Sequence, residues 1–195
     1  MKSLRGTQTE HNLMNSFVNE CQARNRYVFY GQVAEEAGYP LVKKTLERLA
    51  TQEQMHARIF FEILAQQFNG EEIEIKADYP INFYSKDLVK NLEASVNCEL
   101  HEHHEVYPAF AQQAREEGFP LIAKKYELLA EVEKAHSHIL DTIAQDIKND
   151  AVFKKDKEMK WVCQACGHFE IKFAAPKECP FCENSQNMFN PVKLS

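Results

Sequence analysis

Four cysteines near the C-terminal end have the spacing of metal ligands. They form two pairs, Cys163-x-x-Cys166 and Cys179-x-x-Cys182. Two Cys-x-x-Cys pairs typically hold one metal ion in a tetrahedron of thiolates. The alternative is two disulfide bonds, which a reducing compartment disfavours. The sequence therefore predicts a four-thiolate site, and the spacing alone leaves zinc and iron both open.

A second set of potential ligands consists of two Glu-x-x-His pairs, Glu53 with His56 and Glu133 with His136. Residues three apart on a helix share a face, so each pair directs a carboxylate and an imidazole to one point. A single pair of this kind is usually a solvent-exposed helix face. Two pairs at matched positions of a repeat are a stronger signal for a metal site.

The repeat is visible in the sequence. Residues 38–59 align without gaps on residues 118–139, with ten identities in 22 positions, and Tyr27 and Tyr107 keep the same offset of 80. Two unrelated amphipathic helices need not share Gly, Pro, Glu and His. We therefore expect a duplicated helical hairpin that places the two Glu-x-x-His pairs opposite each other.

The two remaining helices must supply further acids. Glu20 precedes Tyr27 by seven residues, whereas Glu99 and Glu102 precede Tyr107 by eight and five. Neither acid keeps the register, so we expect one inserted residue, absorbed as a π-bulge. One Glu from each of two helices, with Glu-x-x-His from the other two, is the ligand set of ferritin-like di-iron and di-manganese bundles. Two cations would offset the burial and mutual repulsion of these carboxylates.

Helix signals divide the first 150 residues into four helices. Thr7-x-x-Glu10 has the pattern of a capping box, and Gly38-x-Pro40 and Gly118-x-Pro120 mark breaks between helices. The expected helices start after Thr7, at Pro40, at a cap on Ser85 and at Pro120, and end near 37, 68, 117 and 149. Residues 71–84 are predicted to form an extended connection long enough to cross the end of the bundle.

The predicted fold is thus mainly α. It is a ferritin-like four-helix bundle with a long crossover between the second and third helices, followed by a small β-rich metal-knuckle domain. The expected divisions are 1–150 for the bundle, 151–160 for a linker and 161–195 for the cysteine domain. In that last domain we expect the aromatic side chains to form a small core: Trp161, Phe169, Phe173 and Phe181.

Charge and hydropathy exclude some classes of function. Residues 1–150 have a net charge of −8, which disfavours a nucleic-acid binder, and residues 151–195 have +2. The split indicates either two surfaces of different composition or a basic tail that docks on an acidic body. No apolar run approaches the roughly 20 residues that span a bilayer, and the first residues lack a secretory pattern, so we expect a cytoplasmic protein without membrane contact.

These motifs together resemble the rubrerythrin family over nearly the whole chain. The residues that carry the resemblance are Met1-Lys2-Ser3-Leu4, Gly6-Thr7, Glu20, Gln22-Ala23-Arg24-Asn25-Arg26-Tyr27, Glu53-x-x-His56, Glu99-x-x-Glu102, Tyr107-Pro108, Glu131-Val132-Glu133-Lys134-x-His136 and the four cysteines. The resemblance implies a di-iron bundle joined to a rubredoxin-like domain with one iron on Cys163, Cys166, Cys179 and Cys182. The implied di-iron ligands are Glu20, Glu53, His56, Glu99, Glu102, Glu133 and His136.

The resemblance also implies roles for these residues. Glu53 and Glu133 would bridge the two irons, and one iron would move between Glu102 and His56 with redox state. Tyr27 and Tyr107 are either partners that orient carboxylates or pass protons, or packed core residues. Three positions depart from the family pattern: Cys98, where a Gly is common, His103, where a Trp is common, and Glu183, where a Gly is often found. A non-glycine residue at 183 predicts a strained or differently hydrogen-bonded second knuckle.

The implied activity is reduction of hydrogen peroxide to water, with electrons from NAD(P)H that arrive through a separate reductase or rubredoxin. Family members are usually homodimers. Two other functions remain open from the residues: a ferroxidase or iron-storage protein, and a structural or interaction protein with a zinc ribbon. An attached electron-carrier domain argues against storage, and the metal in the tail would separate the zinc ribbon from the rest.

Overall fold

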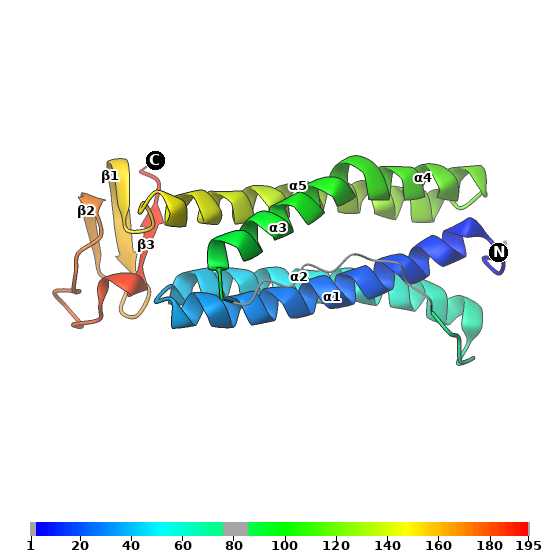
Figure 1. Cartoon of the computed structure of the whole chain (residues 1–195), viewed down its shortest axis with the longest axis horizontal. Helices are drawn as coiled ribbons and strands as arrows, with labels where there is room; N and C mark the ends of the chain where they lie inside the picture. The colour runs from blue at the N-terminus through cyan, green and yellow to red at the C-terminus, as the bar shows by residue number, and fades with distance from the viewer. Residues whose placement is uncertain (1–2, 76–85, 195) are drawn as a thin grey trace.

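The chain forms a bundle of long helices with a small sheet at one end (Figure 1). The computed structural model describes residues 3–75 and 86–194. The helices are α1 (Gln8–Glu36), α2 (Pro40–Phe68), α3 (Leu88–His101), α4 (Tyr107–Glu116) and α5 (Pro120–Lys148), with the π-helical segment η1 (Glu102–Val106) between α3 and α4. The predicted four-helix ferritin-like bundle is confirmed, because α3, η1 and α4 together make the third long helix. No helix in the described part of the chain is long and apolar enough to cross a membrane.

The two hairpins turn in the same way, as the repeat predicts. Gly38 has φ +87°, and the N–H after it donates to the Ala34 carbonyl at 2.8 Å. Gly118 has φ +80°, and the N–H after it donates to the Ala114 carbonyl at 2.7 Å. This left-handed turn closes the helix end and lets the next helix begin at a proline. The helices of each hairpin therefore lie side by side.

The helix starts agree with the sequence at α1 and differ at α3. Thr7 caps α1, because its hydroxyl accepts the N–H of Glu10 at 3.1 Å. Ser85, the predicted cap of α3, lies outside the described residues, and Asp87 caps this helix by accepting the N–H of Lys90 at 3.0 Å. Both Ser and Asp are good N-caps, and the sequence placed the boundary two residues early.

The predicted crossover and linker are only partly visible. Residues 71–75 contain no helix or strand, and the rest of the predicted 71–84 connection lies outside the described residues. Residues 154–160, which the sequence assigned to a linker, form the first part of strand β1 (Lys154–Cys163). Residues of this segment pair with β2, and Lys160 pairs with β3 as well.

The predicted π-bulge is confirmed. In η1 the N–H of Tyr107 donates to the carbonyl of Glu102, five residues earlier, instead of the usual four. The wider turn accommodates one extra residue. Glu99, Glu102 and Tyr107 are consequently all buried on the inner side of the same long helix.

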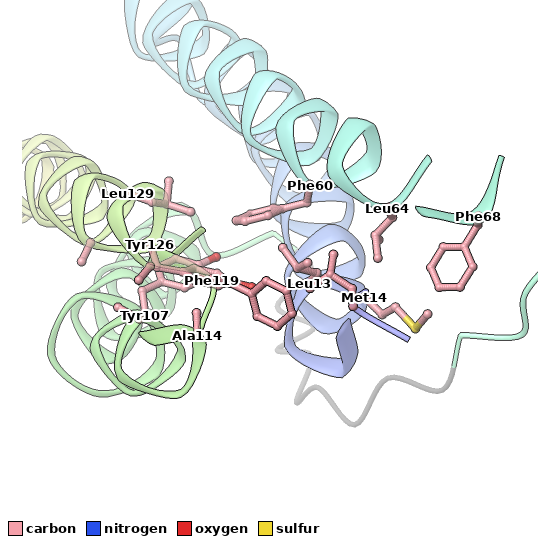
Figure 2. Close-up of a cluster of buried hydrophobic side chains, with 14 residues drawn as sticks. Leu13, Met14, Phe60, Leu64, Phe68, Tyr107, Ala114, Phe119, Tyr126 and Leu129 are labelled. Carbon is pink, nitrogen blue, oxygen red and sulfur yellow. The ribbon is translucent and has the colours of Figure 1, made fainter. Parts of the chain in front are cut away.

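The core has two apolar layers with the polar site between them. One layer includes Leu13, Phe60, Tyr107 and Tyr126, near the N-terminal end of α1 (Figure 2). The other includes Tyr27, Leu46, Leu92 and Leu140, toward the end that carries the sheet. The residues between these layers on each helix include Glu20, Glu53, Glu99 and Glu133, all of them almost completely buried.

The C-terminal sheet has the strand order β2-β1-β3, with β2 (Phe169–Ala174) and β3 (Phe189–Val192) antiparallel to β1. Trp161 is fully buried in the small core, as predicted. The same prediction is wrong for three aromatic residues, which are 50%, 55% and 75% exposed: Phe169, Phe173 and Phe181. Phe169 and Phe173 are four residues apart on the edge strand β2, so both lie on the same face, which points away from the core.

The tail contacts the end of its own bundle. Lys155 Nζ lies 2.6 Å from both carboxylate oxygens of Asp146 on α5. The rings of Tyr39 and Phe153 stack with centroids 6.2 Å apart. One cation of the basic tail thus pairs with an anion of the acidic body at the junction.

Candidate metal centres

The bundle gathers seven potential ligands from all of its long helices. Glu20 comes from α1, Glu53 and His56 from α2, Glu99 from α3, Glu102 from η1, and Glu133 and His136 from α5. Their ligand atoms form two overlapping groups, each with all atoms within 4.8 Å: Glu20, Glu53, His56 and Glu133 in one, and Glu53, Glu99, Glu133 and His136 in the other. The two groups share two carboxylates, Glu53 and Glu133.

The shared carboxylates each turn one oxygen toward each histidine. Glu53 Oε2 lies 2.8 Å from Nδ1 of His56, and its Oε1 lies 2.9 Å from Nδ1 of His136. Glu133 Oε1 lies 3.4 Å from His56 Nδ1, and its Oε2 lies 2.9 Å from His136 Nδ1. This is the arrangement that two bridging carboxylates need in order to span two metal ions.

The histidines present Nδ1 to the pocket. His136 is fixed in this orientation because its Nε2 lies 3.1 Å from Oε1 of Gln52, an amide oxygen that can only accept a hydrogen bond. With its proton on Nε2, the ring has a free lone pair on Nδ1, which is the form that binds a metal. The two imidazole centroids are 5.8 Å apart.

Two tyrosines hold the unshared carboxylates across the bundle. The hydroxyl of Tyr27 on α1 donates to Glu99 Oε1 on α3, and the hydroxyl of Tyr107 on α4 donates to Glu20 Oε1 on α1. Both tyrosines are fully buried. Of the two interpretations left open by the sequence, the contacts favour a role in orienting carboxylates.

Glu102 stands apart from both ligand groups. Its Oε1 accepts a hydrogen bond from Asn19 Nδ2 at 2.9 Å, and the residue is 4% exposed. Asn19 and Gln52 were not among the sequence candidates. Each directly precedes a ligand, Glu20 or Glu53, but contacts a different helix, so spacing along one helix gives no sign of its role.

Burial keeps protons on most of these carboxyl groups while no cation is present. It raises the pKa of Glu20 to about 8 and that of Glu102 to about 7. Burial, with the charges of neighbouring carboxylates, also raises the pKa of Glu99 and of Glu133. Burial acts the same way on Glu53, but the adjacent imidazoles of His136 and His56 outweigh it and lower that pKa to about 2.

The residues present fit a pair of metal ions. Four of these side chains have buried ligand atoms without a hydrogen-bond partner in the described chain: oxygens of Glu53, Glu99 and Glu133, and Nδ1 of His136. Unpaired buried groups of this kind are costly unless a ligand or ion completes them. A donor set of carboxylates and imidazoles suits iron or manganese better than a thiolate-seeking metal.

The neighbouring histidines take no part in the pocket. His101 and His104 are exposed, and Nδ1 of His103 lies 2.7 Å from the Ala130 carbonyl on α5. His138 is exposed on the outer side of α5. These positions place the four side chains outside the pocket.

The four tail cysteines form a second, separate site. Cys163 and Cys182 have their sulfur atoms 3.7 Å apart, and so do Cys166 and Cys179. All four thiols are free, which argues against the disulfide alternative. A tetrahedron with metal–sulfur distances of about 2.3 Å has edges of about 3.8 Å, close to these separations. The backbone N–H of Asn184, with its side chain, lowers the pKa of Cys182 to about 6, which favours the thiolate.

The comparisons with known proteins decide the family. The profile described as Rubrerythrin matches residues 11–141 and 90–172. A rubrerythrin of Clostridium perfringens is 38% identical over 193 residues, covering 99% of this chain and 98% of the relative. Rubrerythrin-1 of Clostridium acetobutylicum is 40% identical, covering 97% and 96%. The chain belongs to the rubrerythrin family.

Solved structures support the fold of this rubrerythrin-family chain. A mixed-valence nigerythrin structure aligns with a TM-score of 0.64 and 23% identity, covering 98% of this chain and 92% of the other. A bacterioferritin of Desulfovibrio desulfuricans, whose title names a diiron site, aligns with a TM-score of 0.64 and 22% identity over 74% of this chain and 82% of the other. At these identities the likeness shows the bundle architecture alone.

The departure at Glu183 has the expected backbone consequence. Glu183 has φ +60°, and its N–H donates to the Cys179 carbonyl at 2.9 Å. Gly167 holds the matching place in the first knuckle with φ +80°, and its N–H donates to the Cys163 carbonyl at 2.8 Å. The hydrogen bonds are the same, so the difference between the knuckles is the strain of a side chain in the left-handed region.

We expect Glu183→Gly to stabilise the tail by about 1 kcal/mol, because glycine removes that strain. Loss of the tail metal to a chelator should become slower, measured by the absorbance of the thiolate site. Glu158→Gly is the matched control, since Glu158 is an exposed residue within β1 where glycine should weaken the strand. Faster metal loss in Glu183→Gly would contradict the strain.

The raised carboxyl pKa values predict how the metal-free bundle responds to pH. Unfolded carboxyls lose protons near 4.5, whereas folded Glu20 retains its proton to about 8. This contribution to stability is complete below pH 4.5 and is lost as pH rises toward 8. The unfolding midpoint of the metal-free chain, followed by helical circular dichroism, should therefore fall by about 5 °C between pH 5.5 and 8. With Mn²⁺ bound it should fall less, and a midpoint that rises in the metal-free chain would refute this account.

Proposed function

We propose that this chain is a peroxidase that reduces hydrogen peroxide to water, with two iron ions in the bundle and one on the four tail cysteines. The observation that carries the proposal is the shared pair, Glu53 and Glu133, each with one oxygen toward His56 and one toward His136. Such a pair supports two adjacent ions that act on both oxygens of one substrate. Two ferrous ions held there would supply the two electrons that cleavage of one O–O bond consumes.

The proposed ligands divide by position. Glu20 and His56 would hold one ion and Glu99 and His136 the other, with Glu53 and Glu133 between them. The separate position of Glu102 supports its proposed exchange with His56. It is buried beside the first group, where its charge raises the pKa of Glu20, but its hydrogen bond to Asn19 holds it aside.

The buried tyrosines have a proposed positioning role. Tyr27 and Tyr107 donate to the outer oxygens of Glu99 and Glu20, which keeps the inner oxygens directed at the pocket. Their aromatic rings also belong to the two apolar layers, so the same side chains exclude water from the site. The carboxylates are thereby oriented, and an aromatic ring covers part of each flank of the site.

The tail is proposed as the point where electrons enter. One iron on four thiolates is a one-electron carrier with no open position for substrate. It would receive electrons from NAD(P)H through a separate reductase or rubredoxin. Cys166 and Cys182 are only half-buried, and the 75% exposed ring of Phe181 lies next to Cys182 in sequence, so a partner can approach this edge of the tail.

The proposed assembly is a homodimer. Within one chain the tail contacts α5 at Asp146. Asp146 lies ten residues beyond His136 of the metal pocket, which is about 15 Å along the helix axis. A groove of about 340 Å³ between α2 and α5 leads from the surface to His56. Its apolar lining includes the exposed side chains of Met55 and Leu128 and the partly buried ones of Ile59 and Val132. A second copy covering this apolar groove is the partner we propose.

The experiment that tests the peroxidase uses the anaerobically iron-loaded and fully reduced chain. One equivalent of hydrogen peroxide should oxidise the two bundle irons, followed by absorbance and by the remaining peroxide. Glu133→Ala should lose bundle iron and reduce peroxide consumption at least about tenfold, because a shared ligand is removed. Glu131→Ala is the matched control, since Glu131 is an exposed acid on the same helix.

Several outcomes would overturn the proposal. Full peroxide consumption by Glu133→Ala would refute the ligand assignment. Mineralisation of many irons per chain without peroxide turnover would favour storage. A colourless tail that retains zinc would support the zinc ribbon, and unchanged donor-linked turnover in Cys182→Ser would refute electron entry through the tail.

The homodimer predicts a solution mass twice that of one chain at micromolar concentration, measured by sedimentation equilibrium. Leu128→Glu should shift this mass toward the monomer, because it places a charge in the apolar groove. Leu194→Glu is the control, since Leu194 is exposed near the C-terminal end of the tail. A monomeric wild-type chain would contradict the assembly.

A further inference from the structure

Three buried polar side chains of α1 and α3 have atoms without a hydrogen-bond partner within the described chain. Asn91 and Ser95 are 0% and 1% exposed, and neither the amide of Asn91 nor the hydroxyl of Ser95 is paired. Arg26 is 7% exposed; its Nη1 lies 3.5 Å from Cys98 Sγ, while Nε and Nη2 are unpaired. Buried polar atoms in proteins are rarely left this way unless ordered water completes them.

These groups lie next to one another and lead to the metal pocket. Asn91, Ser95 and Glu99 are spaced four residues apart, so they follow one stripe of α3 at steps of about 6 Å. Ser95 also neighbours Cys98, three residues later, and Cys98 is the residue that Arg26 contacts. The unpaired groups therefore lie along one stretch of α3, a polar strip that ends at Glu99.

The repeat contains a second copy of this stripe, and that copy is paired. Asn12, Ser16 and Glu20 on α1 have the same four-residue spacing. The hydroxyl of Ser16 donates to the Asn12 carbonyl at 2.8 Å and lies 3.2 Å from the hydroxyl of Tyr126. Asn12 Oδ1 in turn accepts Nε2 of Gln8 at 3.0 Å.

The difference between the copies has a direct cause. In the aligned repeat, the position of Tyr126 is occupied by Leu46, which is fully buried. Leucine has no hydroxyl, so the second copy lacks the partner that tyrosine gives Ser16, and Ser95 Oγ stays unpaired. Figure 2 shows Tyr126 in the paired half of the bundle, packed beside Tyr107 and Phe119.

We propose that ordered water molecules occupy the polar strip of Asn91, Ser95 and Arg26, in the place that the Tyr126 hydroxyl fills in the other half, and that this water supplies protons to the metal pocket. The proton role rests on the proposed peroxidase function. Reduction of one hydrogen peroxide takes up two electrons and two protons and forms two water molecules. The electrons would come from irons held by the bundle ligands, and a hydrogen-bonded water strip is a suitable carrier for the protons.

The water is tested first by a crystal structure of the metal-loaded chain. Wild type should show ordered water within hydrogen-bond distance of Ser95 Oγ and of the Asn91 amide. Leu46→Tyr should displace that water, with the new hydroxyl close to Ser95. A wild-type strip without water would overturn the proposal whether or not the chain is a peroxidase.

The proton role is tested by the rate at which peroxide oxidises the fully reduced chain, in H₂O and in D₂O. Ser95→Ala should slow this reaction at least about tenfold and increase its solvent isotope effect, without loss of iron. Ser16→Ala is the matched control, because Ser16 lies four residues before Glu20 as Ser95 does before Glu99. Unchanged rate and isotope effect in Ser95→Ala would overturn the proton role, while absent peroxide turnover in an iron-loaded, hydrated wild type would refute the peroxidase and the proton role together.

Discussion

The structure depends on the burial of five carboxylates in the middle of an apolar bundle. Glu20, Glu53, Glu99, Glu102 and Glu133 are each at most 4% exposed. Repulsion and desolvation on this scale cannot be relieved by the two histidines alone, which is why most of these carboxyls retain protons without a cation. The apolar layers on either side keep bulk solvent away from it. The buried tyrosines, which donate to carboxylates on other helices, hold these side chains in place.

The sequence was informative where a pattern repeats and silent where contacts cross between hairpins. The offset of 80 residues identified the duplicated hairpin, and the altered spacing before Tyr107 located the π-helical turn. Asn19 and Gln52 were missed because their partners lie on other helices, at distances along the chain that no periodicity reports. The aromatic residues of β2 were misjudged because composition cannot show which face of an edge strand is covered.

The two halves of the bundle have diverged in a consistent way. Both keep an Asn, a Ser and a Glu on one stripe, and both keep a tyrosine that crosses to a carboxylate. The stripe on α1 is paired by Tyr126 of α5, whereas Leu46 of α2 occupies the position of Tyr126 in the repeat and leaves the stripe on α3 unpaired. The repeat thus places the ligands symmetrically. The two polar stripes beside them differ, because hydroxyl groups of the protein pair the stripe on α1 and leave the stripe on α3 unpaired.

The π-helical turn also limits how this site could have arisen. Because the wider turn absorbs the extra residue locally, α3 before it and α4 after it keep their inward faces. The loss of a single codon between 102 and 106 would restore an ordinary helix with Glu99 and a tyrosine seven residues apart, as in α1. Glu102 is the donor residue without a counterpart in α1, where Ala23 lies three residues after Glu20. The π-helical turn therefore marks the place where a site with six matched donor residues becomes a lopsided one with seven.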